Sequence, residues 1–398
     1  MDFDFTEEEQ EFADGFRHFC TREISPYSES YEEAGEIPKT QFQKLANLGF
    51  LGLLHEKKYG GSELGYMKTM IVQEILAEAC GSTFFSVGAS AGLFGLPISE
   101  FGTEAQKGKY LPGIIEGSKI GCLAVTEPDA GSDVMGIKTI ARKKNGKYYL
   151  SGQKTYITNA PNSDYAVVLA KLEDDGKKIG PTTFIVNTNA KGVSKGKPMK
   201  KLGLKASPTG ELFFDELELS EDDILGKKGR GFKIIMDAFN RERLSLGAYS
   251  VGVMAACIAE SRKFSRTRKT FGRPIYKHQS VAYMLADMRV KYEASRNLLY
   301  ETAWMMDKFG GEKSKDRLIH NGFPVDLTAK TATFKLLSST LAREVCNLAV
   351  QLHGGAGYME EYKVARLYRD IKIAEIGGGT SEIQKQIIAH SEAKRIKV

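Results

Sequence analysis

The chain has 398 residues, of which 42% are hydrophobic and 27% charged, and this balance predicts a folded protein of two or three domains and excludes a disordered chain. Its 56 basic and 50 acidic residues give a formal net charge of +6, and the lack of long Lys/Arg runs argues against a nucleic-acid-binding surface. The five cysteines are scattered without a C-x-x-C pair, and the six histidines form no H-x-x-x-H pattern. We therefore expect a reducing compartment, no disulfide framework and no metal site.

The start of the chain shows neither a signal peptide nor an Arg-rich transit peptide. Residues 1–5 are acidic and apolar, and helical periodicity follows them directly. No stretch approaches the apolar length of a membrane span. The sequence therefore predicts a cytoplasmic protein without a membrane span.

Residues 1–119 predict an N-terminal helical domain, in which Ile71, Ile75 and Leu76 show helical spacing. Residues 120–228 predict a β domain, because β-branched and aromatic residues gather between turns. The segments concerned are 147–157, 165–172, 181–187 and 211–219. Asn145-Gly146 is a strong signal for a two-residue hairpin turn. We expect this middle domain to be antiparallel, in the form of a small barrel.

Residues 229–398 return to a period of 3.6 residues and predict a C-terminal bundle of long helices. The longest periodic runs are 232–266, 280–308 and 327–351. The segment 310–324 contains two glycines, a charged stretch and Phe323-Pro324, and we expect it to be a long exposed connection between helices. The order of domains is α, β, α, which places the chain in the α+β class.

Three consecutive glycines, Gly377 to Gly379, precede the last expected helix. Glycine accepts positive φ and lets a ligand approach the backbone closely. Ser381 and Gln384 form a capping-box pattern, and the start of a helix suits an anion. From these residues alone, a ligand-binding loop and an ordinary turn before a helix both stay open.

A second candidate loop spans residues 123–133, with the sequence LAVTEPDAGSD. It follows an apolar strand end and offers hydroxyls and backbone amides. Such groups suit hydrogen bonding to a polar ring edge or to a phosphate. A plain turn is the alternative.

Seven motifs, in order, resemble the acyl-CoA dehydrogenase family over essentially the whole chain. They are YGG at 59–61, FGTEAQK at 101–107, LAVTEPDAGSD at 123–133, GQKTYITN at 152–159, RKTFG at 268–272, QLHGGAGY at 351–358 and GTSEIQ at 379–384. The resemblance implies an N-terminal helical domain, a central antiparallel β-barrel domain and a C-terminal four-helix bundle. FAD would lie between the last two domains and be shared with a neighbouring subunit.

The same resemblance implies a reaction and its partners. A carboxylate would remove the α-proton of an acyl-CoA thioester while the β-hydrogen leaves as hydride to flavin N5, which gives the trans-2-enoyl-CoA. An electron-transferring flavoprotein would accept the electrons, and the protein would be a homotetramer. Two alternatives stay open: a flavin-dependent enoyl-CoA reductase of the same fold, and a nucleic-acid-binding flavoprotein that is not a dehydrogenase.

By this resemblance, two groups of residues would bind the FAD. Those beside the flavin and pantetheine are Leu123, Val125, Thr126, Ser132, Tyr156, Thr158, Thr380 and Glu382. Those beside the pyrophosphate, ribityl and adenosine parts are Arg268, Thr270, Phe271, Gln279, Gln351 and Gly355, of which the last two would meet the cofactor of the neighbouring subunit. Arg268 also offers a planar fork for phosphate, although a solvated basic helix face is the alternative.

The catalytic carboxylate of many family members stands immediately before the Gly-Thr of the tail motif, where this chain has Gly378. Isovaleryl-CoA and long-chain acyl-CoA dehydrogenases carry it on a C-terminal-domain helix instead, in a pattern that FNRERL at 239–244 resembles. The base is therefore assigned to Glu242.

The residues around Glu242 support this assignment independently. Its helical neighbours at three and four residues are Ala238, Phe239, Ser245 and Leu246, which predicts an apolar face and a raised pKa suited to general-base catalysis. An ion pair with another helix is the alternative. By contrast, Arg241 has Asp237 at i−4 and is interpreted as one half of a surface ion pair.

The substrate is predicted from missing side-chain volume. Gly377 and Gly378 stand where relatives often have Tyr and Glu, so a branched, cyclic or aryl-bearing acyl group is favoured, for example isovaleryl-like or arylsuccinyl-like. Ser132 and Arg243 match substrate-contacting positions of the family. Ser82 stands where glutaryl-CoA dehydrogenases place an arginine, which argues against glutaryl-CoA.

Overall fold

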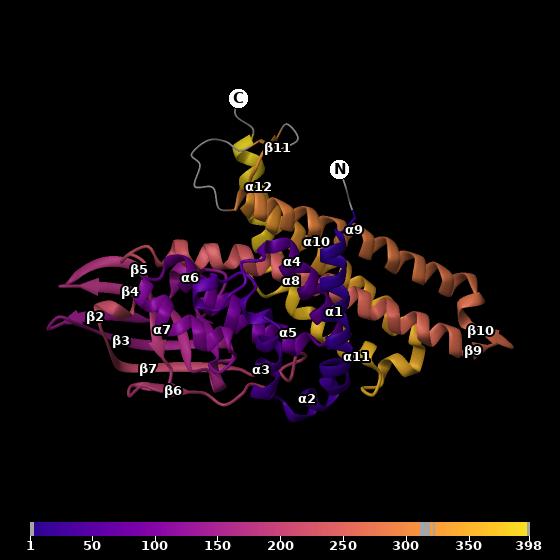
Figure 1. Ribbon diagram of the computed structural model, residues 1–398, viewed down its shortest axis with the longest axis horizontal. Coiled ribbons are helices and arrows are strands. Elements are labelled where there is room, and N and C mark those ends of the chain that lie inside the picture. The colour runs from indigo at the N-terminus through magenta and orange to yellow at the C-terminus, as the bar shows by residue number, and fades with distance from the viewer. Residues whose placement is uncertain (1–3, 311–318, 321–322, 396–398) are drawn as a thin grey trace.

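The computed structural model describes residues 4–310, 319–320 and 323–395. Figure 1 shows a β-sheet at one end of an elongated molecule, long helices that reach the other end, and the N-terminal helices packed between them. The predicted fold class, with an N-terminal helical domain, a central β domain and a C-terminal helical bundle, is confirmed. Both predicted domain boundaries fall in connections between elements, one after Ile115 and one after Leu225, and they stay predictions.

The N-terminal part is built from short helices. They are α1 (Glu7–Glu23), α2 (Ser28–Ala34), α3 (Lys39–Asn47), α4 (Gly65–Ala79), α5 (Gly81–Val87), a π-helix (Gly88–Gly95), α6 (Leu96–Phe101) and α7 (Glu104–Ile115). Two of them begin at a capping box, with Thr6 before α1 and Thr103 before α7, which satisfies backbone amides that a helix start leaves unpaired.

The β domain contains strands β1 (Gly121–Ala124), β2 (Ile140–Lys144), β3 (Lys147–Thr158), β4 (Tyr165–Asp174), β5 (Lys177–Asn187), β6 (Val193–Lys195), β7 (Thr209–Leu219) and β8 (Ile224–Leu225). The order in the sheet is β6-β7-β3-β2-β4-β5-β8, with β1 beside β4. Asn145 and Gly146, at φ of 52° and 79°, close the β2–β3 hairpin as predicted, because a type I′ turn needs positive φ at both positions.

The sheet differs from the antiparallel expectation at two pairings, β1 with β4 and β2 with β4, which are parallel. The reason lies in the strand order. The hairpin sets β2 antiparallel to β3, and β4 then runs opposite to β3 on the far side of β2, so β2 and β4 point the same way. β1 pairs with the first half of β4, before the part that β2 covers.

The C-terminal part contains α8 (Gly231–Thr267), a ribbon of β9 (Lys269–Thr270) and β10 (Arg273–Pro274), α9 (Gln279–Phe309), α10 (Leu327–His353), α11 (Lys363–Asp370) and α12 (Ser381–Arg395). The expected connection at 310–324 falls largely outside the described residues. Within it, β11 (Ile319–His320) pairs with β12 (Phe323–Pro324).

Two helical stretches correct the expectation about apolar length. Gly81–Phe101 and Gly231–Thr267 are long and apolar enough to cross a membrane by length and composition alone. However, 56% and 78% of their most apolar windows lie buried inside the protein, as in core helices that are packed against other elements on several sides.

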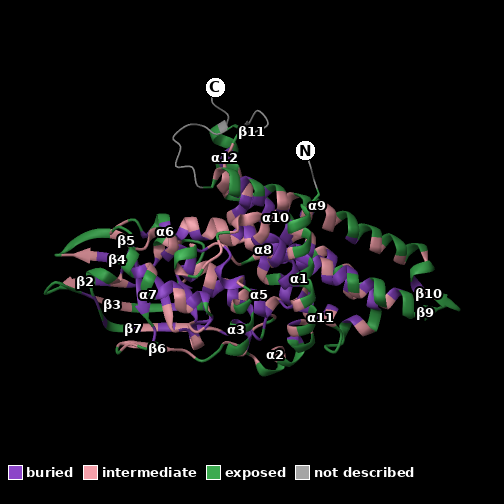
Figure 2. Ribbon diagram, viewed as in Figure 1, coloured by how far each residue is buried: buried purple, intermediate pink, exposed green. Residues whose placement is uncertain are grey.

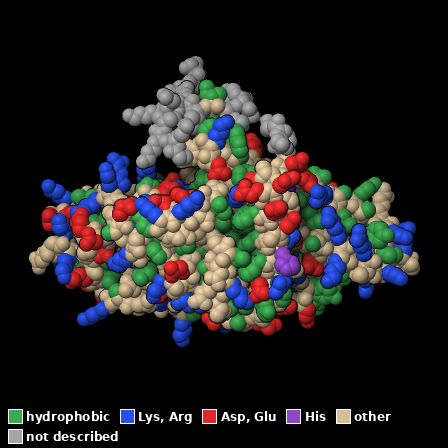
Figure 3. Space-filling view, in the orientation of Figure 1, with side chains coloured by type: hydrophobic (Ala, Val, Ile, Leu, Met, Phe, Trp, Pro, Cys, Tyr) green, Lys and Arg blue, Asp and Glu red, His purple; other side chains and the backbone are tan. Residues whose placement is uncertain are grey.

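Charged side chains of both signs are interspersed on the molecular surface. Figure 3 shows Lys and Arg mixed with Asp and Glu over the face it presents. Neighbouring elements share partly exposed ion pairs, such as Lys44 with Glu23 at 2.7 Å and Lys291 with Glu344 at 2.9 Å. Each such pair adds little stability, but together they leave no continuous basic field on this face.

Helix α8 is the element that the rest of the molecule packs around. It contacts α4, α9, α10 and β5, and its middle is buried (Figure 2). The crossing with α10 is close because Gly247 has no side chain: a Cβ there would collide with the ring of Phe334. At the crossing with α4, a Cβ at Gly252 would likewise collide with the backbone carbonyl of Glu74.

We predict that Gly247→Ala lowers the free energy of unfolding by about 2 kcal/mol or more, because the helices must move apart to admit one methyl group. The matched control is Gly15→Ala on α1, where nothing lies within 4 Å of the added Cβ and a gain of about 0.5–1 kcal/mol is expected. Urea unfolding of both variants measures this. Equal stability of Gly247→Ala and the wild type would contradict the packing account.

Candidate active site

A cavity of about 1080 Å³ lies where the N-terminal helices, the sheet and the C-terminal helices meet. Its walls come from α4 and α5, the loop after β1, the end of β3, the first half of α8, and the glycine run Gly377–Gly379. Most of the exposed wall is apolar, and its polar groups include the side chains of Thr126, Thr158 and Glu242. This is the usual composition of a site for a small organic ligand.

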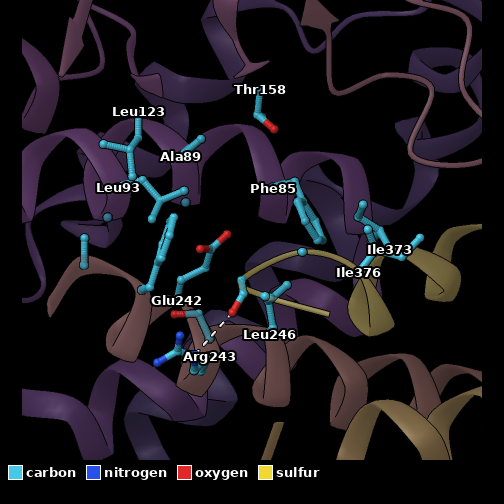
Figure 4. A pocket seen from close by; sticks show the side chains of 18 of the residues that line it. Phe85, Ala89, Leu93, Leu123, Thr158, Glu242, Arg243, Leu246, Ile373 and Ile376 are labelled. Carbon is cyan, nitrogen blue, oxygen red and sulfur yellow. Dashed lines mark hydrogen bonds between the residues drawn. The ribbon is translucent and has the colours of Figure 1, made fainter. Parts of the chain in front are cut away.

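Glu242 is the carboxylate inside this cavity. Figure 4 shows its side chain extending from α8 into the space bounded by Phe85, Leu93 and Leu246. Loss of water around the carboxyl group raises its pKa to about 7, against the opposing influence of the charges on Arg243 and Lys335. These surroundings match the apolar face expected from its helical neighbours. Its role as a base stays a prediction.

The glycine run closes the cavity next to Glu242. Gly378 has a φ of +62° and Gly379 a φ of +93°, which other residues adopt only with strain. A Cβ at Gly378 would lie 2.9 Å from Leu246 Cδ1 and 3.6 Å from Glu242 Oε2. A side chain at position 378 would therefore point at the place that the Glu242 carboxylate already reaches.

Three side chains hold the glycine run by its carbonyl oxygens. Arg243 Nε donates to Gly378 O at 3.2 Å, the bond drawn in Figure 4. Lys335 Nζ donates to Gly379 O at 2.8 Å. Gln384 Nε2 donates to both carbonyls, at 3.1 and 2.7 Å. The run is thus fixed from α8, α10 and α12 at once.

The helix start after the run differs from the predicted capping box. The hydroxyl of Thr380 accepts from Ile383 N at 3.4 Å, so Thr380, and not Ser381, caps α12. Ser381 Oγ donates instead to Glu375 O at 3.5 Å. The helix begins at Ser381, one residue earlier than the pattern assumed, and Gln384 turns back onto the glycine carbonyls.

The predicted surface ion pair of Arg241 is also corrected. Arg241 does pair with Asp237, at 2.9 Å, but its side chain is only 12% exposed and it also pairs with Glu100. The reason is that α8 packs against α6 at this point, which covers the guanidinium. Arg243, two residues further along α8, is buried too, and its Nη1 donates to Asn240 Oδ1 at 2.6 Å.

Glu127 and Lys154 belong to the motifs at 123–133 and 152–159, but the sequence alone assigns them no role. They form a buried ion pair at 2.8 Å, and Lys154 Nζ also donates to Val125 O at 2.9 Å. Glu127 accepts from the backbone amide of Thr139 at 3.0 Å. A charged pair is expensive to bury unless every group is bonded, so this pair fixes the loop that carries Val125 and Thr126. The signal available was a Glu and a Lys inside two motifs that the fold brings together.

The structure divides the predicted site residues into two groups. Eleven line the cavity: Leu123, Val125, Thr126, Ser132, Tyr156, Thr158, Glu242, Arg243, Gly377, Gly378 and Thr380. Tyr156 is 68% exposed and has a φ of +59°, so its ring is held out from β3 into the open part of the site. Glu382 is exposed on the first turn of α12 and is not among the described residues that line the cavity.

The other six predicted residues gather at the far end of α8, around the β9–β10 ribbon and the end of α10. They are Arg268, Thr270, Phe271, Gln279, Gln351 and Gly355, and all are exposed. The ends of the two helices are joined by the ring of Phe264, which stacks on that of His353. Position 268 follows position 242 by 26 residues of helix, or about 39 Å. Within one chain, these residues are therefore remote from Glu242.

Ser82 lies outside the cavity lining, so it carries no argument against glutaryl-CoA as a substrate. Its hydroxyl donates to Glu32, and the residue is 1% exposed. Among the described residues that line the cavity, α5 contributes Phe84, Phe85 and Val87 but not Ser82. The residue at this position thus says nothing about an acidic acyl group.

Comparisons with known proteins agree in all parts of the chain. Family models for the N-terminal, middle and C-terminal domains of acyl-CoA dehydrogenases match residues 6–118, 122–217 and 229–392. The 3-(aryl)acrylate reductase of Clostridium sporogenes is 36% identical over 98% of this chain and 100% of its own. The caffeyl-CoA reductase–Etf complex subunit CarC of Acetobacterium woodii is 35% identical over 97% and 98%. The structure of butyryl-CoA dehydrogenase from Megasphaera elsdenii superposes with a TM-score of 0.91 at 35% identity, covering 99% and 100%.

We predict that Glu242→Gln raises thermal stability at pH 8 but not at pH 5. The pKa of this carboxyl group is raised on folding to about 7. Between its unfolded pKa and its folded pKa the group ionises in the unfolded chain but keeps its proton in the folded protein, so the folded state loses stability as the pH rises through this range. Above pH 7 the full loss remains, and below the unfolded pKa there is none. Because the group faces the cavity, we expect a gain of about 1–2 kcal/mol at pH 8.

The control is Glu301→Gln, whose carboxylate is 46% exposed in a pair with Lys330. It should show no such gain at pH 8. An unchanged melting temperature of Glu242→Gln at both pH values would contradict the raised pKa.

Proposed function

The chain belongs to the acyl-CoA dehydrogenase family, and from this premise we propose that Glu242 removes the α-proton of an acyl-CoA thioester as it is dehydrogenated to the trans-2-enoyl-CoA. Enzymes of this family act on the CH–CH group of acyl-CoA and use FAD. The observation that supports Glu242 most strongly is the pair of facts at one place: a half-buried carboxylate that faces the cavity, and a glycine where a side chain would collide beside it.

The residues of this chain fit the cofactor. Leu123 and Val125 offer an apolar wall, Thr126 and Thr158 offer hydroxyls, and the exposed ring of Tyr156 offers an aromatic face. FAD bound there supplies the two-electron acceptor that takes the β-hydrogen as hydride. The Lys154–Glu127 pair keeps the loop of Val125 and Thr126 in place for it.

Glu242 can act as a base because its pKa lies close to neutral pH. A carboxyl group with a pKa near 7 is partly ionised at neutral pH and is basic enough to take a weakly acidic carbon-bound proton. The apolar walls of Phe85, Leu93 and Leu246 keep water away from it. After the transfer, the proton resides on a Glu242 carboxyl oxygen.

A bulky acyl group suits the space next to Glu242. Gly377 lines the cavity, and the nearest atoms to a Cβ at this position are 3.4 Å away or more, so a Cβ would fit there in ordinary van der Waals contact. The surrounding side chains Phe85, Ile373 and Ile376 are apolar. These features favour a branched, cyclic or aryl-bearing acyl chain, and the similarity to a 3-(aryl)acrylate reductase supports the aryl choice.

A second copy of the chain completes the cofactor site in this proposal. The phosphate-binding candidates around Arg268 lie about 39 Å along α8 from Glu242, so they would serve the FAD of a neighbouring subunit. The exposed rings of Phe271 and Tyr358, at 92% and 83%, would be covered by the same contact. We propose a homotetramer, and a monomer with full FAD occupancy in sedimentation experiments would contradict it.

The electron acceptor is proposed to be an electron-transferring flavoprotein, since a relative is a subunit of a complex with one.

The reductase direction is the second candidate function, because two similar proteins are named as reductases of aryl-substituted acrylates or their CoA esters. Mixing the reduced protein with an enoyl-CoA tests it. Fast reoxidation, together with no reduction by the saturated acyl-CoA, would favour the reductase.

We predict that anaerobic addition of a branched or aryl acyl-CoA bleaches the flavin, with a rate that rises through a pH midpoint near 7 as Glu242 loses its proton. Glu242→Gln should bind FAD and lose bleaching by about 100–10,000-fold, because general-base catalysis supplies a factor of that size and the amide cannot accept the proton. Stopped-flow absorbance measures both. Bleaching of Glu242→Gln at near the wild-type rate would refute the assignment.

The absence of a side chain at Gly377 gives a separate prediction. Gly377→Leu should lower kcat/KM for isovaleryl-CoA and aryl acyl-CoA by about 10–100-fold, while butyryl-CoA keeps its value within a few-fold, because a few methylene groups of filled space cost about 1–3 kcal/mol. The comparison is made on one preparation with all three thioesters. An equal loss for all of them would show that the position does not select the acyl group.

A further inference from the structure

Lys335 on α10 is a fully buried lysine that the proposed reaction does not use. It is 0% exposed, and its ammonium donates to Gly379 O at 2.8 Å. Lysine is almost never fully buried unless its charge is compensated, because removing an ammonium group from water is costly. Burial indeed lowers the pKa of Lys335 to about 8, and at neutral pH most of the group still carries its charge.

The hydrogen bond to Gly379 does not require a charge. Gln384 Nε2 already donates to the same carbonyl oxygen, at 2.7 Å. A neutral donor thus performs this task from α12. The positive charge of Lys335 needs another explanation.

The groups that face Lys335 identify one. The charges that act on the Lys335 ammonium are those of Glu242 and Arg243 from α8, Glu375 from the end of the 3-10 helix before the glycine run, and Glu382 from α12. Glu375 is satisfied by Arg343 at 2.9 Å and by Lys372 at 2.7 Å. Glu382 is exposed on the first turn of its helix.

Glu242 is the remaining carboxylate. Among the described residues, the charges that act on its pKa are those of Arg243 and Lys335, and both lower it against the larger effect of burial. Arg243 is engaged with Asn240 and with Gly378, and Figure 4 draws the second of these bonds.

We propose that Lys335 is a positioning residue for the base: its ammonium holds the glycine run against Glu242, and its charge favours the ionised form of the Glu242 carboxylate, so that a substantial fraction is ionised at neutral pH. This inference rests on the proposed role of Glu242. A hydrophobic residue in place of Lys335 leaves burial of the carboxylate unopposed from α10, so the base keeps its proton to a higher pH.

The test compares the FAD-loaded wild type with Lys335→Met and Lys335→Gln. The glutamine variant retains a donor for Gly379 without the charge. In both variants we expect the pH midpoint of acyl-CoA-dependent bleaching to rise by about one unit, because a nearby opposite charge shifts a carboxyl pKa by about that much or more. At pH 7 the rate then falls about fivefold, and it recovers at higher pH.

The matched control is Lys330→Met, on the same helix, where the lysine is partly exposed and pairs with Glu301 at 2.8 Å. It should leave the midpoint unchanged. Lys335→Arg, which keeps the charge, should move the midpoint back toward the wild-type value. A merely structural role for Lys335 would change the rate equally at all pH values.

A second readout does not depend on activity. At pH 8, Glu242→Gln should raise the melting temperature more in the Lys335→Met background than in the wild type, because the ionised carboxylate is less favourable without the lysine. Equal gains in the two backgrounds, or an unchanged bleaching midpoint in whichever Lys335 variant retains flavin, would overturn the inference. A wild type that no acyl-CoA bleaches would instead refute the proposed function, and the stability comparison would still report on Lys335 and Glu242.

Discussion

One constraint organises the site: the carboxylate of Glu242 and a side chain at position 378 would compete for the same space. The backbone of Gly378 has positive φ, and any Cβ there would be pressed against Leu246 and directed at the Glu242 carboxyl group. The carboxylate therefore comes from α8, and the glycine run Gly377–Gly379 contributes only backbone atoms at this place. This exchange explains why the loop is so rich in glycine, and also why its carbonyl oxygens need support from three helices.

Helix α8, which carries the base, also packs against elements from all three parts of the molecule. α8 runs from the sheet to the β9–β10 ribbon (Figure 1), and glycines at positions 247 and 252 let α10 and α4 approach it closely. Close packing makes the position of Glu242 stiff relative to the cavity walls, which general-base catalysis requires because proton transfer depends on short, well-directed contacts. A rigid α8 also fixes the distance between the cavity and the exposed group around Arg268.

Much of this arrangement could be predicted from local sequence. Periodicity identified the three long helices, and Asn145-Gly146 identified the hairpin, because both signals depend on residues that are neighbours in the chain. The parallel pairing of β4 could not be predicted in this way, since it depends on strand order across the sheet. The burial of Arg241 was missed for a similar reason: its partner Glu100 comes from α6, far away in the sequence.

The site shows the same division. The apolar surroundings of Glu242 followed from its own helix, whereas Lys335 and the Lys154–Glu127 pair depend on contacts between distant elements. A buried lysine is not visible in a periodic pattern, because the pattern assigns polar residues to the surface. The distance between the two groups of predicted cofactor residues likewise required the full length of α8.

The central claim is that Glu242 removes the proton from the α-carbon, and it can be measured apart from hydride transfer. Phenylacetyl-CoA has acidic α-hydrogens but no β-hydrogen that can leave as hydride, so it reports proton removal alone. In D₂O, with the FAD-loaded protein, we predict that its α-hydrogens exchange for deuterium, and that Glu242→Gln abolishes this exchange. Exchange at the wild-type rate in Glu242→Gln would show that another group is the base.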